Sequence, residues 1–150
     1  LEAQELVGRT FDEMIGDSSR MIARLTHQSG LGMTQENKDR VIISGARFIF
    51  DYPEFEDVNT LRILFTALEE RVAAFWDFLN ENVDDDVRVF IGDEISLFKN
   101  RSCAMIITPV RTQNETRAMF GVLGPMRMNY SDVIAKLKAL RDHMQSVSDE

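Results

Sequence analysis

Apolar residues near the start of the chain recur every three or four positions, which predicts an amphipathic helix. Thr10 and Glu13 have the spacing of a capping box, in which each side chain accepts a hydrogen bond from the other residue's backbone N–H. We expect this helix to begin at Thr10 and to end at Gly30 and Gly32, with Gly30 as a left-handed C-cap. Its apolar face is a candidate seam for a dimer or for packing, formed by Phe11, Met14, Ile15, Met21, Ile22 and Leu25.

A second apolar period predicts the longest helix, from about Asp57 to Leu79. Its steps alternate between three and four residues, as in a heptad seam. Other apolar residues widen the stripe, which favours packing on a sheet or on several neighbours, with a dimer interface as the alternative. The seam consists of Val58, Leu61, Phe65, Leu68, Val72, Phe75 and Leu79, and it is widened by Leu64, Trp76 and Phe78.

Short β-rich runs between glycines and polar turns predict a sheet. Ser102–Val110 is apolar at nearly every position, as expected for a strand covered on both faces. It forms a predicted antiparallel hairpin with Arg117–Leu123 through a polar loop at Thr112–Thr116. The helices and strands together predict an α+β domain with helices packed on a mostly antiparallel sheet. The other expected elements are strands at Arg40–Gly45 and Val87–Ile91 and a last helix capped by Asn129 or Ser131.

Size and charge narrow the classes of function. The 150 residues are enough for one domain with a real core. The formal net charge of −8 opposes the phosphate backbone, so the chain is a poor candidate for DNA binding. No run approaches the ~18 apolar residues of a membrane span and no signal peptide opens the chain, so we expect a cytoplasmic protein without a membrane partner. The first residue is Leu1, which indicates a fragment or a processed product.

Residue types that carry chemistry are present, but not in catalytic or metal-binding patterns. Cys103 lies in an apolar run and is expected to be a buried core thiol. The consecutive carboxylates Asp84–Asp86 converge poorly on one ion, so we expect a solvated turn. Asp93 and Glu94 follow a strand, where a turn or a helix cap is favoured over an active site. We expect no enzyme, no cofactor and no metal site.

Several stretches resemble the HrcA family of heat-inducible transcription repressors. Gly121-Val-Leu-Gly-Pro-Met-Arg-Met-Asn-Tyr-Ser131 is similar to the family signature GVIGPTRMDY, with Met126 in place of Thr and Asn129 in place of Asp. Four further blocks resemble family stretches in the same order, over about residues 8 to 144. They are Gly8-Arg9-Thr10, Val41–Ala46, Pro53–Val58 with Leu61-Arg62, and Arg88–Glu94 with Leu97-Phe98. The signature turn, as named below, consists of Gly121, Gly124, Pro125, Arg127, Met128 and Tyr130.

The resemblance implies an architecture and a set of partners. Residues 1–40 would be the helical end of an inserted dimerisation region, and residues 41–150 the C-terminal part of a partial GAF-like domain without its early strands. The chain would be the regulatory and dimerisation portion of a heat-shock repressor that controls chaperonin genes. The implied partners are a second copy in a homodimer and a GroEL-type chaperonin, with operator DNA bound only through a missing N-terminal winged helix. The alternative is a small-molecule-sensing GAF-type domain in which Arg127 anchors the ligand; a surface ion pair is the simpler role for Arg127.

Overall fold

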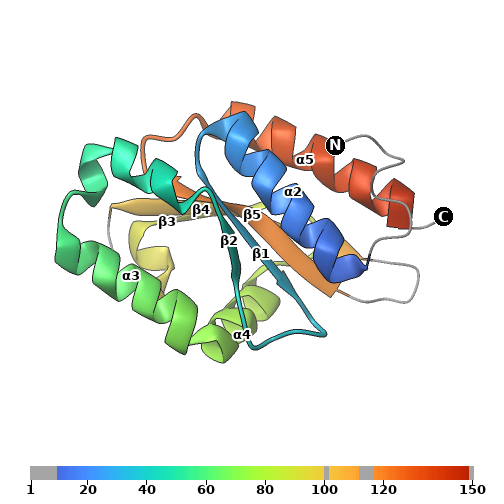
Figure 1. Ribbon diagram of the computed structural model, residues 1–150, viewed down its shortest axis with the longest axis horizontal. Coiled ribbons are helices and arrows are strands. Elements are labelled where there is room, and N and C mark those ends of the chain that lie inside the picture. Colours follow the sequence, from blue (N-terminus) through green and yellow to red (C-terminus); the bar gives the residue numbers. More distant parts are fainter. Residues whose placement is uncertain (1–9, 100–101, 112–116, 149–150) are drawn as a thin grey trace.

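The computed structural model describes residues 10–99, 102–111 and 117–148, and within them the chain forms one five-stranded sheet. The strand order is β2-β1-β5-β4-β3, and every neighbouring pair is antiparallel (Figure 1). The α+β class expected from the sequence is therefore confirmed. The strands are β1 (Ser29–Thr34), β2 (Ile42–Ser44), β3 (Arg88–Ile91), β4 (Cys103–Arg111) and β5 (Arg117–Pro125).

Helices cover both faces of this sheet (Figure 1). Helices α2 (Phe11–Thr26) and α5 (Tyr130–Ser148) pack on one face, and α3 (Val58–Glu70) and α4 (Val72–Asn82) pack on the other. Successive β4 residues alternate between two core clusters, because Ile106 faces α2 and α5 while Met105 and Ile107 face α3 and α4. This double burial explains why β4 is apolar at nearly every position, with Thr108 as a buried polar exception. The described residues also form four short 3₁₀ segments: η1 (Ala46–Asp51), η2 (Pro53–Phe55), η3 (Gly92–Glu94) and η4 (Ser96–Phe98).

The prediction that the first helix ends at Gly30 and Gly32 is wrong. Helix α2 ends at Thr26, His27 takes the left-handed cap conformation with φ of 54°, and both glycines lie inside β1. The glycines are needed because β1 crosses closely beneath α2. A Cβ atom on Gly30 would lie 3.0 Å from the Ser19 carbonyl carbon, and one on Gly32 would lie 2.6 Å from Ile15 Cγ2. Because Gly30 and Gly32 have no side chains, β1 can pack closely against α2.

The single long helix expected from Asp57 to Leu79 is two helices. Arg71 leaves the helical region, with φ of −116° and ψ of 36°, and separates α3 from α4. The apolar period runs through Arg71 without a gap, so the pattern gave no sign of the interruption. Val58 was expected on the seam and is instead 65% exposed at the start of α3.

The expected division at residue 40 falls between two paired strands. β1 pairs with β5 from Ser29 to Thr34 and with β2 on its other side. Residues 10–34 thus supply a helix and a strand of the same sheet. Gly8, Arg9 and the loop at Thr112–Thr116 lie outside the described residues.

Candidate functional site

The signature turn connects the end of β5 to the start of α5. Gly121 and Gly124 lie in β5, Pro125 is its last residue, and Tyr130 begins α5. The Met128 backbone N–H donates to the Pro125 carbonyl at 3.2 Å, and the Tyr130 hydroxyl donates to the Met126 carbonyl. Met128 is buried in the core cluster under α2 and α5. The turn is therefore closed by its own hydrogen bonds and anchored in the core.

Two stretches that resemble the family separately in the sequence meet at an ion pair. Arg127 Nε donates to Glu54 Oε2 at 2.8 Å, and Arg127 Nη2 donates to Glu54 Oε1 at 3.2 Å. The Arg127 guanidinium also lies 5.8 Å from the centre of the Tyr52 ring. Its hydrogen bond to Glu54 lowers the pKa of that carboxyl and raises the pKa of the arginine. Arg127 thus has the surface ion pair that the sequence allowed as its simpler role.

The buried side chain of Gln28 links Tyr52, which lies beside the Arg127–Glu54 ion pair, to the turn after α2. Gln28 Nε2 donates to the Tyr52 hydroxyl at 3.1 Å, and that hydroxyl donates to the His27 carbonyl at 2.9 Å. A Cβ atom on Gly124 would lie 2.9 Å from Gln28 Cδ, so glycine at this position makes room for the glutamine side chain. Burial is the main cause of a raised pKa at Tyr52. We call these side chains, with Arg127 and Glu54, the motif junction.

The Glu54 ion pair predicts a pH-dependent contribution to stability. Because the folded-state pKa of Glu54 is lowered, its stabilising effect is present above the unfolded-state pKa and is lost as the pH falls through the folded-state value. We expect Glu54→Gln to lower Tm slightly at neutral pH and to match the unmodified chain in strongly acidic buffer. Thermal melts from about pH 7 to about pH 3 measure this difference. Glu56→Gln, at an exposed carboxylate without an ion-pair partner among the described residues, is the control. A Tm difference that stays constant with pH would contradict the assignment.

The candidate seam on α2 faces the interior of the chain over most of its length. Ile15 and Ile22 are fully buried in the cluster shared with α5, and Met14 is buried beside them. Phe11 and Met21 are half-buried against the same cluster, whereas Leu25 is 50% exposed. The Ser18 hydroxyl donates to the Met144 sulfur, which ties α2 to α5.

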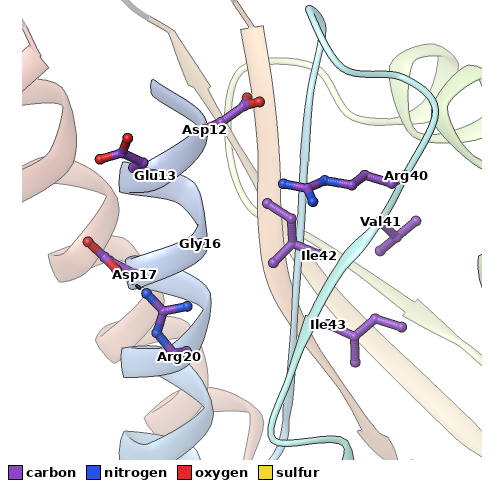
Figure 2. Close-up of a pocket in the computed structure, with 9 residues that line it drawn as sticks. All are labelled: Asp12, Glu13, Gly16, Asp17, Arg20, Arg40, Val41, Ile42 and Ile43. Carbon is purple, nitrogen blue, oxygen red and sulfur yellow. Dashed lines mark hydrogen bonds and ion pairs between the residues drawn. The ribbon is translucent and has the colours of Figure 1, made fainter. Parts of the chain in front are cut away.

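A hollow of about 600 Å³ separates α2 from the edge strand β2 (Figure 2). Asp12 and Arg40 point toward it from its two sides, whereas Glu13 and Asp17 point away from β2. Arg20 forms an ion pair with Asp17, and Asp12 Oδ1 accepts a hydrogen bond from the Thr34 hydroxyl at 2.7 Å. Within the described part of the chain β2 pairs with β1 alone, so the outer edge of β2 is open.

The residues considered for chemistry have structural roles. Cys103 is buried, and burial raises the pKa of its thiol to about 12. Glu94 Oε1 accepts a hydrogen bond from the Ile91 backbone N–H at 2.7 Å and so caps η3, as predicted. Asp85 pairs with Arg111 at 3.2 Å and Asp86 with Arg141 at 3.0 Å. Over the described ranges, no group of three metal-binding side chains converges, and no helix is long and apolar enough to cross a membrane.

Sequence reasoning missed Arg117, which holds the connection between α4 and β3. Its guanidinium donates to the Asn80 side chain and to the carbonyls of Val83 and Asp84, the last at 2.8 Å. Burial lowers the pKa of this arginine. No local pattern marks it, because its partners lie more than 30 residues away and accept mainly through backbone atoms.

Loss of the Arg117 side chain should weaken the fold. We expect Arg117→Met to reduce the free energy of unfolding by about 1–3 kcal/mol, since it removes three hydrogen bonds and leaves the carbonyl of the buried Val83 without this donor. Urea denaturation measures the change. Arg111→Met is the matched control, because Arg111 lies opposite Arg117 in the β4–β5 register and forms an exposed ion pair. We expect the control to change stability by less than about 0.5 kcal/mol. Equal effects of the two substitutions would contradict the role of Arg117.

Comparison with known protein families shows to which family the chain belongs. The model of the HrcA protein C-terminal domain matches residues 3–134. The chain belongs to the HrcA family. The heat-inducible transcription repressor HrcA of Methylobacillus flagellatus is 31% identical over 134 residues, which cover 89% of this chain and 39% of that protein. The HrcA of Thermodesulfovibrio yellowstonii is 28% identical over 158 residues and covers 95% of this chain and 44% of its own length. The chain thus spans less than half the length of these HrcA relatives.

Solved structures share the fold at low sequence identity. A hypothetical protein solved at 2.2 Å superposes with a TM-score of 0.63 and 11% identity, over 91% of this chain and 71% of that one. A transcriptional regulator from Rhodococcus sp. RHA1 superposes with a TM-score of 0.52 and 12% identity, over 98% of this chain and 71% of the regulator. The similarity to these solved structures concerns the fold alone. It agrees with the GAF-like α+β architecture that the resemblance to the HrcA family implied.

Proposed function

We propose that this chain is the regulatory and dimerisation portion of a heat-shock transcription repressor that controls chaperonin genes. The observation that carries the proposal is the HrcA family match over residues 3–134. The convergence of two family-like stretches at the Arg127–Glu54 ion pair supports it. In this proposal the protein is cytoplasmic and is not an enzyme. Operator DNA is contacted by a winged-helix domain outside these 150 residues, in keeping with the net charge of −8.

The proposed repressor acts as a homodimer, because an inverted-repeat operator requires two DNA-binding heads related by a two-fold axis. The side of the molecule formed by α2 and β2 supports this role. The open edge of β2 leaves backbone donors and acceptors that a second strand can pair, and Leu25 is exposed on the adjacent helix. In this view the segment before residue 40 contributes to dimerisation while it packs on the sheet.

The second proposed partner is a GroEL-type chaperonin that keeps the repressor folded. Chaperonin binding then sets the active fraction by mass action, and unfolded proteins compete for the chaperonin during heat shock. Exposed apolar side chains support recognition by such a partner; they include Leu25, Phe50, Ile63, Ile91 and Met126.

Reconstituted transcription tests this regulation. The template carries a chaperonin-type promoter with an inverted repeat, and the repressor is the intact product of the gene that encodes this chain. We expect repression to rise with added chaperonin and to fall when an unfolded client protein is added. Repression that is indifferent to chaperonin would overturn the proposed partner, and absence of repression under every condition would overturn the proposed function.

A further inference from the structure

A second hollow, of about 320 Å³, lies on the opposite face of the molecule from α2, between α3 and η4. Its surface is formed mostly by apolar atoms, from the exposed side chain of Ile63, the buried Ala67 and the half-buried Leu97. The rest of the lining is Thr66 and three basic residues, Arg62, Arg71 and Lys99, and no acidic residue contributes to it. The hollow therefore combines an apolar floor with basic residues.

The three basic residues are available for a ligand. Arg62, Arg71 and Lys99 are exposed, and none of them has an ion-pair partner among the residues that the structure describes. By contrast, other cations of this acidic chain, such as Arg127 and Arg141, are paired with carboxylates. Three cations grouped without a counter-charge create a local positive potential, which favours an anion.

Backbone irregularities place two of these cations beside the hollow. Arg71 occupies the non-helical break between α3 and α4, and Lys99 has a left-handed conformation with φ of 49°. A lysine in this region of φ and ψ is uncommon. Arg62 and Leu97 also belong to the family-like stretches Leu61-Arg62 and Leu97-Phe98, yet the motif junction does not use either residue. The hollow brings these two stretches together.

We propose that this hollow binds a small anion with an apolar tail, such as a medium-chain carboxylate. The tail occupies the apolar floor against Ile63 and Leu97, and the carboxylate lies near Arg62, Arg71 and Lys99. Carboxylates pair well with guanidinium groups, which favours an anionic head over a neutral one. A volume of about 320 Å³ is at the lower end of the range for small-molecule sites, so the ligand is short. This inference goes beyond the proposed repressor function and does not depend on it.

Isothermal titration calorimetry on the full chain tests the site, with butanoate, hexanoate and octanoate as probes. We expect octanoate to bind with a Kd below about 1 mM, as befits a ligand of this size. Each added CH₂ group should tighten binding by roughly two- to fourfold until the hollow is full. Octylamine has the same tail and the opposite charge, so it should bind at least tenfold more weakly than octanoate.

Two variants test whether octanoate binds in this hollow. We expect Arg62→Glu to weaken octanoate binding at least tenfold, and Arg24→Glu, on the exposed face of α2 and far from this hollow, to leave it unchanged. Circular dichroism checks that both variants are folded. Failure of octanoate to bind, equal binding of octylamine, or equal loss in the two variants would each overturn the proposal. None of these outcomes bears on operator binding, which tests the repressor function separately.

Discussion

Replacing Gly121 with alanine is expected to lower the free energy of unfolding by more than about 3 kcal/mol. A Cβ atom at this position would lie 2.8 Å from the Ile106 carbonyl carbon and 2.9 Å from Ile107 Cα, and closer still to the Ile106 carbonyl oxygen. These are backbone atoms of β4, which is paired on both sides by β5 and β3. Because β4 separates the two core clusters, it cannot retreat without disturbing both.

Urea denaturation of Gly121→Ala measures this effect, and Gly16→Ala provides the matched control. The atom nearest to a Cβ on Gly16 is Arg20 Nη1 at 3.9 Å, and Gly16 lies inside α2. Alanine favours a helix more than glycine does, so we expect the control to gain up to about 1 kcal/mol. If Gly121→Ala were as stable as Gly16→Ala, the close approach of β5 to β4 would be wrong.

Alkylation of Cys103 should be at least about a thousandfold slower in the folded chain than in the urea-unfolded chain. Burial raises the thiol pKa from 9.0 to about 12, and three pKa units correspond to about a thousandfold fewer reactive thiolates. The side chain is also fully buried at the start of β4, which hinders access of the reagent. The remaining reaction proceeds through unfolding.

Mass spectrometry of iodoacetamide-treated samples follows this reaction at mildly alkaline pH. Because Cys103 is the single cysteine, one added group reports on it alone. We expect labelling to accelerate with urea in step with the loss of circular dichroism. Rapid labelling of the folded chain would show that the start of β4 opens locally, and would contradict its place in the core.

The sequence predicted best those elements in which the pattern of apolar residues follows directly from which positions are buried. The apolar runs of β4 and β5 predicted the antiparallel hairpin correctly, and the Thr10 side chain accepts a hydrogen bond from the Glu13 backbone N–H at 3.1 Å, as expected for the helix cap. The periodic apolar face of α2 likewise lies on the core. These features depend on neighbours within a few residues, which a pattern can register.

Features that depend on distant contacts were missed. β1 was read as a helix end because Gly30 and Gly32 suggest a stop, whereas their role is the approach of β1 to α2. The break at Arg71 leaves the apolar period intact, and the acceptors of Arg117 are carbonyls with no sequence signature.

The signature turn was found by resemblance to a family, but its partner Glu54 became evident only when the fold brought the two stretches together. The same holds for the hollow at Arg62, because α3 and η4 are separated in sequence by α4 and β3. In both cases the sequence identified some of the residues, such as Arg127 and Arg62, and tertiary contacts determined what they face.

A gel shift with an inverted-repeat chaperonin operator tests the central claim most directly. It compares the intact product of the parent gene, with and without purified GroEL-type chaperonin, against this 150-residue chain alone. We predict a specific shift for the intact product that chaperonin strengthens, and no shift for the chain alone. An intact product that gives no shift, or that is no longer than this chain, would contradict the assignment of the chain to the regulatory portion of a heat-shock repressor.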